Sequence, residues 1–83
     1  MLTNEELAAM LCYTPLVFER INKKLQQKMT ISEATAFVHF AVLTADELVT
    51  RGKNIYAANY RQHVCVTVNK HNHRVITVTQ LTT

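Results

Sequence analysis

The feature that most constrains the fold is a change in the spacing of apolar residues near position 48. Before this point apolar residues recur at helical spacing, as Val17 and Ile21 do. After it they alternate with polar residues, most clearly in segments 63–69 and 73–80, which are rich in Val, Ile and Thr. Helices that precede the strands, instead of alternating with them, predict an α+β fold with an antiparallel sheet.

Capping signals predict where the helices begin. Thr3 with Glu6, and Thr30 with Glu33, have the spacing of a capping box, in which each side chain binds the other residue's backbone N–H. Between them, Thr14-Pro15 predicts another helix start, because Pro at the first helical position loses no needed donor.

We expect the second helix to cover about 15–28 and the third to end between 44 and 47. The second helix has an apolar stripe opposite a basic one. Its apolar residues are Val17, Phe18, Ile21 and Leu25, its basic residues are Arg20, Lys23, Lys24 and Lys28, and the third helix turns Ala34, Phe37, Val38, Ala41 and Val42 inward.

Residues 48–51 and 54–57 read as a short hairpin whose turn is supplied by Gly52. A competing interpretation continues the third helix through Arg51, with Gly52 as its C-cap. We favour the hairpin, followed by a loop over 58–62.

The register of the last hairpin follows from a three-residue loop, 70–72, in which Asn72 takes a left-handed conformation. Val68 then faces Arg74, Val66 faces Ile76 and Val64 faces Val78. This register places Val64, Val66, Val68, Ile76 and Val78 on the core face, and His63, Cys65, Thr67, Asn69, His73, Val75, Thr77 and Thr79 on the other face.

The predicted fold class is therefore α+β, with two to three N-terminal helices packed on one face of a three- or four-stranded antiparallel β-meander. We expect one domain over 1–83, divided into a helical layer (1–47) and a basic antiparallel sheet (48–83). A hydrophobic content of 48% is sufficient for one core.

Charge is divided unevenly between these two halves. Residues 51–83 carry five Lys or Arg and no Asp or Glu, whereas all six acids precede residue 51. A basic, acid-free half attracts anions, so we expect a binding protein, not an enzyme, that docks a nucleic acid or an acidic protein surface. The expected binding residues are Arg51, Lys53, Asn54, Tyr56, Tyr60, Arg61, His63, His73 and Arg74. The basic stripe of the second helix is another candidate surface.

Two other functions compete with this interpretation. The first is a ribonuclease in which His63 or His73 acts as acid or base, although no spacing in the chain defines an active site. The second is a homo-oligomer, such as a homodimer, that uses the polar sheet face or an edge strand.

No cofactor, metal or membrane is expected. His71 and His73 lack a third ligand, since His63 lies at the far end of its strand. No apolar run approaches the roughly 20 residues of a membrane span, and the N-terminus is acidic, unlike a signal peptide. Two cysteines, Cys12 and Cys65, do not make a disulfide framework, which favours a cytoplasmic protein with reduced thiols.

Three segments, 14–25, 50–56 and 64–69 with its partner 74–78, resemble an uncharacterised bacterial family of short stand-alone domains of unknown function. The most specific part is Arg51-Gly52-Lys53-Asn54 followed by Tyr56. Ile55 and a longer loop after Ala57 depart from the family pattern. This resemblance implies no activity and no catalytic residue. The order of elements also resembles RelE/ParE-type toxins in topology. For the binding protein itself, an inhibitor or accessory factor carried by a phage or mobile element is one expected role.

Overall fold

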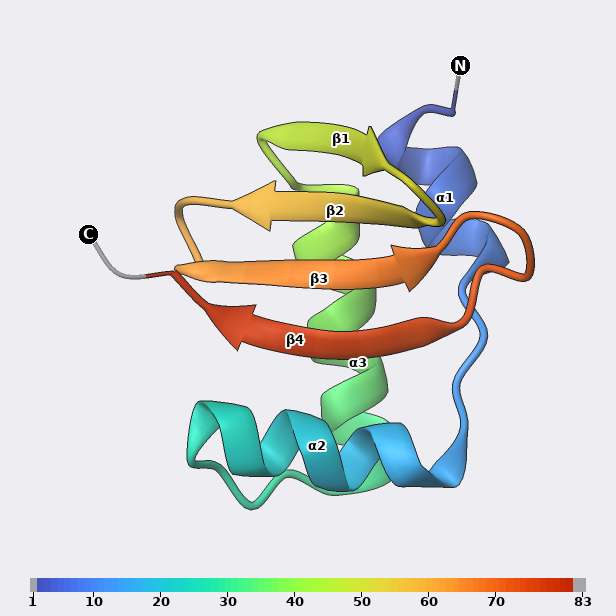
Figure 1. Ribbon diagram of the computed structural model, residues 1–83. Coiled ribbons are helices and arrows are strands. Elements are labelled where there is room, and N and C mark those ends of the chain that lie inside the picture. The colour runs from blue at the N-terminus through green and yellow to red at the C-terminus, as the bar shows by residue number, and fades with distance from the viewer. Residues whose placement is uncertain (1, 82–83) are drawn as a thin grey trace.

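The computed structural model describes residues 2–81 and consists of three helices followed by four strands (Figure 1). The helices are α1 (Asn4–Met10), α2 (Pro15–Leu25) and α3 (Ile31–Leu43), and the strands are β1 (Glu47–Arg51), β2 (Asn54–Asn59), β3 (Val64–Asn69) and β4 (Val75–Gln80). The strands form one antiparallel sheet in the order β1-β2-β3-β4, which confirms the predicted α+β meander.

Both predicted capping boxes are present. The Thr3 hydroxyl accepts a hydrogen bond from the Glu6 backbone N–H at 3.1 Å, and the Glu6 carboxylate accepts one from the Thr3 N–H at 3.1 Å. Thr30 and Glu33 repeat the arrangement at the start of α3. Because these bonds form within one turn, they pair backbone donors that the helix itself leaves free.

Helix α2 begins at Pro15 as expected but ends at Leu25, three residues earlier than the predicted end at residue 28. Gln26 adopts a left-handed conformation (φ 55°) and stops the helix. Asn22 then fixes the following loop, because its side chain both donates to and accepts from the Met29 backbone, at 3.0 and 2.9 Å.

The chain between α3 and β2 turns as the hairpin interpretation predicts. Helix α3 stops at Leu43 with Thr44 as its C-cap, so the competing extension of this helix through Arg51 is wrong. Gly52 occupies the β1–β2 turn with φ 57°, a conformation that costs glycine little. Strand β2 continues to Asn59, so the predicted loop 58–62 is also wrong in its first two residues.

The predicted register between β3 and β4 is wrong, and two local features explain the difference. The β3–β4 loop has one more residue than expected, since the Asn69 N–H donates to the Arg74 carbonyl at 2.9 Å. His73 (φ 59°), not Asn72, takes the left-handed conformation.

A bulge in the β3–β4 ladder adds a further shift. Val68 pairs with Val75, whereas beyond the irregularity Val66 pairs with Val78 instead of Ile76. Val64 pairs with Gln80. The longer loop therefore pairs Val75 with Val68 and turns it into the core, and the bulge leaves Ile76 without a cross-strand partner and half-buried. Together these two features reverse the predicted places of the two side chains.

The core lies between the sheet and α3, which packs across β2 and β3 behind the sheet in Figure 1. Helix α2 runs alongside β4, and α1 packs on α3. The sheet contributes Ile55, Ala57, Val64, Val66, Val68, Val75 and Val78 to the core, and the helices contribute Leu7, Ala8, Val17, Ile21, Leu25, Ala34, Val38, Ala41 and Val42.

Within residues 2–81, no helix covers the opposite side of the sheet, which we call the open face. The strand pairings assign to it Glu47, Val49, Arg51, Asn54, Tyr56, Ala58, Cys65, Thr67, Asn69, Thr77 and Thr79. In the same part of the chain, every helix is too short or too polar to cross a bilayer.

Candidate functional site

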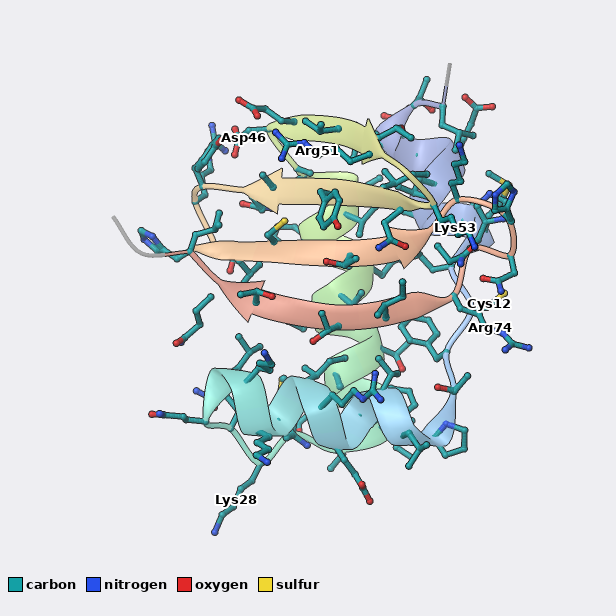
Figure 2. The ribbon with its side chains drawn as sticks, viewed as in Figure 1. Cys12, Lys28, Asp46, Arg51, Lys53 and Arg74 are labelled. Carbon is teal, nitrogen blue, oxygen red and sulfur yellow. The ribbon has the colours of Figure 1, made fainter. Side chains whose placement is uncertain are left out.

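The nine residues predicted to bind a partner do not form one site, because they are divided between two ends of the sheet. In a meander, successive turns lie at opposite ends of the strands. The β1–β2 and β3–β4 turns share one end, where Lys53 and Arg74 lie close to Cys12 in Figure 2. The β2–β3 turn, with Tyr60 and Arg61, lies at the other end, a strand length of about 17–20 Å away.

The first end holds the two turns that carry Lys53, Lys70 and Arg74. The Lys70 backbone N–H donates to the Lys53 carbonyl at 2.9 Å, so the two turns are in direct contact. Arg51 is the last residue of β1, but its side chain extends back over the open face, away from Lys53 (Figure 2). Arg74 directly precedes β4. We call Lys53, Lys70 and Arg74, all of which are exposed, the basic rim.

The β3–β4 loop is held in shape by amide side chains. The Asn69 side-chain carbonyl accepts from the backbone N–H groups of His71 and Asn72, at 2.8 and 3.2 Å. The Asn72 side chain accepts from the Arg74 N–H at 3.0 Å. These bonds satisfy backbone donors inside the loop and so fix where the cations of the rim emerge.

Backbone hydrogen bonds that the sequence did not predict connect the rim to the helical layer. The Cys12 N–H donates to the His73 carbonyl at 2.8 Å, and the Val75 N–H donates to the Cys12 carbonyl at 2.9 Å. The α1–α2 connection thus forms an isolated parallel bridge with Arg74. Backbone pairing carries no side-chain signature at Cys12, so composition and spacing could not have located it.

The opposite end of the sheet is electrostatically mixed. The Tyr60 N–H donates to the Asp46 carboxylate at 2.8 Å. The negative charge of Glu47 raises the pKa of Tyr60, with smaller contributions from desolvation and Asp46. Arg61 and His63 therefore share this end of the sheet with two acids, Asp46 and Glu47, which precede segment 51–83 and were not counted in its charge.

The open face provides a shallow hollow of about 370 Å³, lined by Val49, Arg51, Tyr56 and Cys65. Burial raises the pKa of the Cys65 thiol, which disfavours its nucleophilic form. Of the predicted residues, Arg51 and Tyr56 meet in this hollow, and Asn54 lies on the same face near the rim. The hollow can hold an apolar or aromatic group beside a guanidinium.

The two histidines predicted to act at a site, His63 and His73, also lie at opposite ends of the sheet. His63 (φ 57°) directly precedes β3 at the mixed end, and His73 lies in the loop at the rim. The two cannot reach one phosphate across the length of β3. Among residues 2–81, no three His, Cys, Asp or Glu side chains lie together in a group that could hold a metal ion.

Comparison with known proteins gives a family but no activity. A search of the curated proteins and of the solved structures found no match. The topological similarity to RelE/ParE-type toxins is therefore not supported. A family model described as "Protein of unknown function (DUF3781)" matches residues 6–79, nearly the whole chain, and this confirms the resemblance to a family of unknown function. The chain belongs to the DUF3781 family.

Proposed function

We propose that this protein is a non-catalytic binding module whose basic rim docks an anionic macromolecule. One observation carries the proposal: the 2.9 Å hydrogen bond from the Lys70 N–H to the Lys53 carbonyl holds two acid-free turns side by side. Their cations are exposed, and the loop that presents Arg74 is fixed by hydrogen bonds of its own. A partner would thus meet positive charges that need little reorganisation.

The distribution of charge also gives the partner a direction of approach. Asp46 and Glu47 lie at the end of the sheet remote from the rim (Figure 2 labels Asp46). A negatively charged surface is attracted to the rim and repelled from the mixed end, so it docks in one orientation. Because the cations are exposed, added salt is expected to weaken this interaction.

The proposal assigns the protein to the cytoplasm, as an inhibitor or accessory factor for its partner. Cys12 and Cys65 are both free thiols, which supports a reducing compartment.

The test compares two double variants with the same change in charge. Lys53→Glu/Arg74→Glu alters the rim, and Lys28→Glu/Arg61→Glu alters exposed cations elsewhere. Each tagged protein is used to capture partners from a lysate of the organism that encodes it, with and without nuclease treatment. We expect the rim variant to lose a partner that the wild type and the matched control retain.

Nuclease treatment separates the two partner classes, because a captured nucleic acid disappears and a directly bound protein remains. Capture that is equal for both variants, with unchanged thermal unfolding, would refute the rim as the docking site.

A further inference from the structure

A groove between α2 and β4 continues from the basic rim. Residues at positions i, i+3 and i+4 of a helix share one face, and Arg20, Lys23 and Lys24 have this spacing. These three cations line a hollow of about 630 Å³ together with Ile76 and Thr77. The helix runs alongside β4 (Figure 1), so these three exposed cations flank a strand.

The bulge between β3 and β4 helps to create the groove. Because Ile76 is the extra residue of this bulge, it has no cross-strand partner, stays half-buried and lines the hollow beside the basic residues. The Thr77 hydroxyl is buried and makes no hydrogen bond within residues 2–81. The groove therefore has an apolar side chain next to its cations.

A second hollow, of about 220 Å³, connects this groove to the rim. Its lining includes Arg20 and Arg74 with the apolar side chains of Leu16 and Ile76, of which Leu16 is 65% exposed. The two hollows share Arg20 and Ile76. We call the pair of hollows the α2–β4 groove, which extends from Arg74 of the rim along α2 to Lys24.

The chemistry of the lining selects the occupant. Carboxylates complement the cations, and apolar side chains complement Leu16 and Ile76. Single-stranded nucleic acid is the poorer fit, since bases are held by aromatic stacking and the residues that line the two hollows include no aromatic ring. The nearby Tyr13 ring already stacks on Phe18, with centroids 5.7 Å apart.

We infer that the α2–β4 groove binds an extended acidic segment of a partner protein, in which carboxylates alternate with apolar side chains. This inference rests on the proposed function, because it identifies the anionic partner as a protein and extends its docking surface from Arg74 along α2. About four to six residues of extended chain span such a groove.

The test uses a fluorescein-labelled peptide of about eight residues that alternates Glu with Val or Leu. Its controls are the same peptide with Lys in place of Glu and a labelled oligothymidine of similar length. Fluorescence anisotropy measures binding to the wild type, to Arg20→Glu/Lys24→Glu and to the matched control Lys28→Glu/Arg61→Glu. NMR amide shifts identify the surface that the peptide occupies.

We expect the acidic peptide to bind the wild type and the matched control alike, and Arg20→Glu/Lys24→Glu to weaken binding about tenfold. The shifted amides should include Ile76 and Thr77. Equal affinity for both variants, shifts outside the groove, or tighter binding of oligothymidine would each overturn the inference.

The two proposals fail in different ways. If capture from the lysate is lost in Lys53→Glu/Arg74→Glu but kept in Arg20→Glu/Lys24→Glu, the groove inference is wrong and the rim proposal stands. If the peptide binds in the groove while the rim variant still captures its partner, the rim proposal is wrong.

Discussion

Asn59 is the buried polar residue on which the junction between the helical layer and the sheet depends. Its side chain is 0% exposed, and its amide donates to the Ala41 carbonyl and to the Thr44 hydroxyl, both at 2.9 Å. Its carbonyl accepts from the Gln62 N–H at 3.0 Å. The Ala45 N–H, the helical partner that the Ala41 carbonyl would otherwise have, bonds to Val42 instead, so Asn59 replaces a missing donor at the end of α3.

The cost of replacing Asn59 with Ala follows from these contacts. Each hydrogen bond contributes about 1 kcal/mol net, and a buried group left without a partner costs about 1–3 kcal/mol. We expect Asn59→Ala to lower the free energy of unfolding by about 2–4 kcal/mol in total. A domain of this length has roughly 4–12 kcal/mol of stability, so the melting temperature should fall by about 10–20 °C.

Asn59→Asp tests the same reasoning with a side chain of equal size. The introduced carboxyl faces the Ala41 carbonyl in a buried site, and burial raises its pKa in the folded state above the unfolded value. The loss of stability caused by the buried, ionised carboxylate is therefore absent at a pH below the unfolded pKa and is complete once the pH has risen through the folded pKa. The variant should lose stability relative to the wild type between about pH 4 and pH 7, whereas Asn59→Ala should show no such trend.

Urea unfolding followed by circular dichroism measures all three proteins at both pH values. If Asn59→Ala and Asn59→Asp both unfold within about 0.5 kcal/mol of the wild type, the role assigned to this side chain is refuted.

Three further predictions concern single groups. Because burial raises the pKa of Cys65 whereas Cys12 is exposed, Cys12→Ala should react with Ellman's reagent more slowly than Cys65→Ala, and equal rates would contradict this. Thr77→Val removes a buried hydroxyl without a partner in the described chain, so we expect the free energy of unfolding in urea to rise by about 1 kcal/mol. A lower free energy of unfolding would contradict this prediction. Hydrogen bonds from Thr30 lower the pKa of Glu33 below its ordinary value of 4.5. The stability that these bonds give the folded protein is therefore present above pH 4.5 and is lost as the pH falls through the folded pKa. The melting temperature of Thr30→Ala should thus lie a few degrees below that of the wild type near neutral pH, and the difference should shrink in acid.

The sequence predicts those parts of the fold that depend on neighbouring residues. Several local features depend only on contacts within a few residues, so the sequence itself contains their patterns. They are the capping boxes at Thr3 and Thr30, the start of α2 at Pro15 and the turn at Gly52. The element order then fixes the α+β class.

The register of β4 could not be predicted in the same way, because a bulge leaves only a weak signal in sequence. Val75 and Ile76 are both suitable for a core, and the length of the β3–β4 loop and the position of the bulge decide which of them is buried. The arrangement of the predicted binding residues in space could not be predicted for another reason. Charge was counted along the chain, whereas the alternation of turns separates Arg61 from Arg74 and the fold brings Arg20 beside Arg74.

The Cys12 bridge has a consequence for the order in which the chain folds. Each strand of the meander pairs with its neighbour in sequence, so the sheet can form by closing short loops. The bridge and the α2–β4 contact instead join residues about sixty positions apart, and such contacts form at a greater entropic cost. Hairpin formation should therefore precede the docking of α2, and the α2–β4 groove, with Arg20 beside Arg74, should be among the last features to be completed.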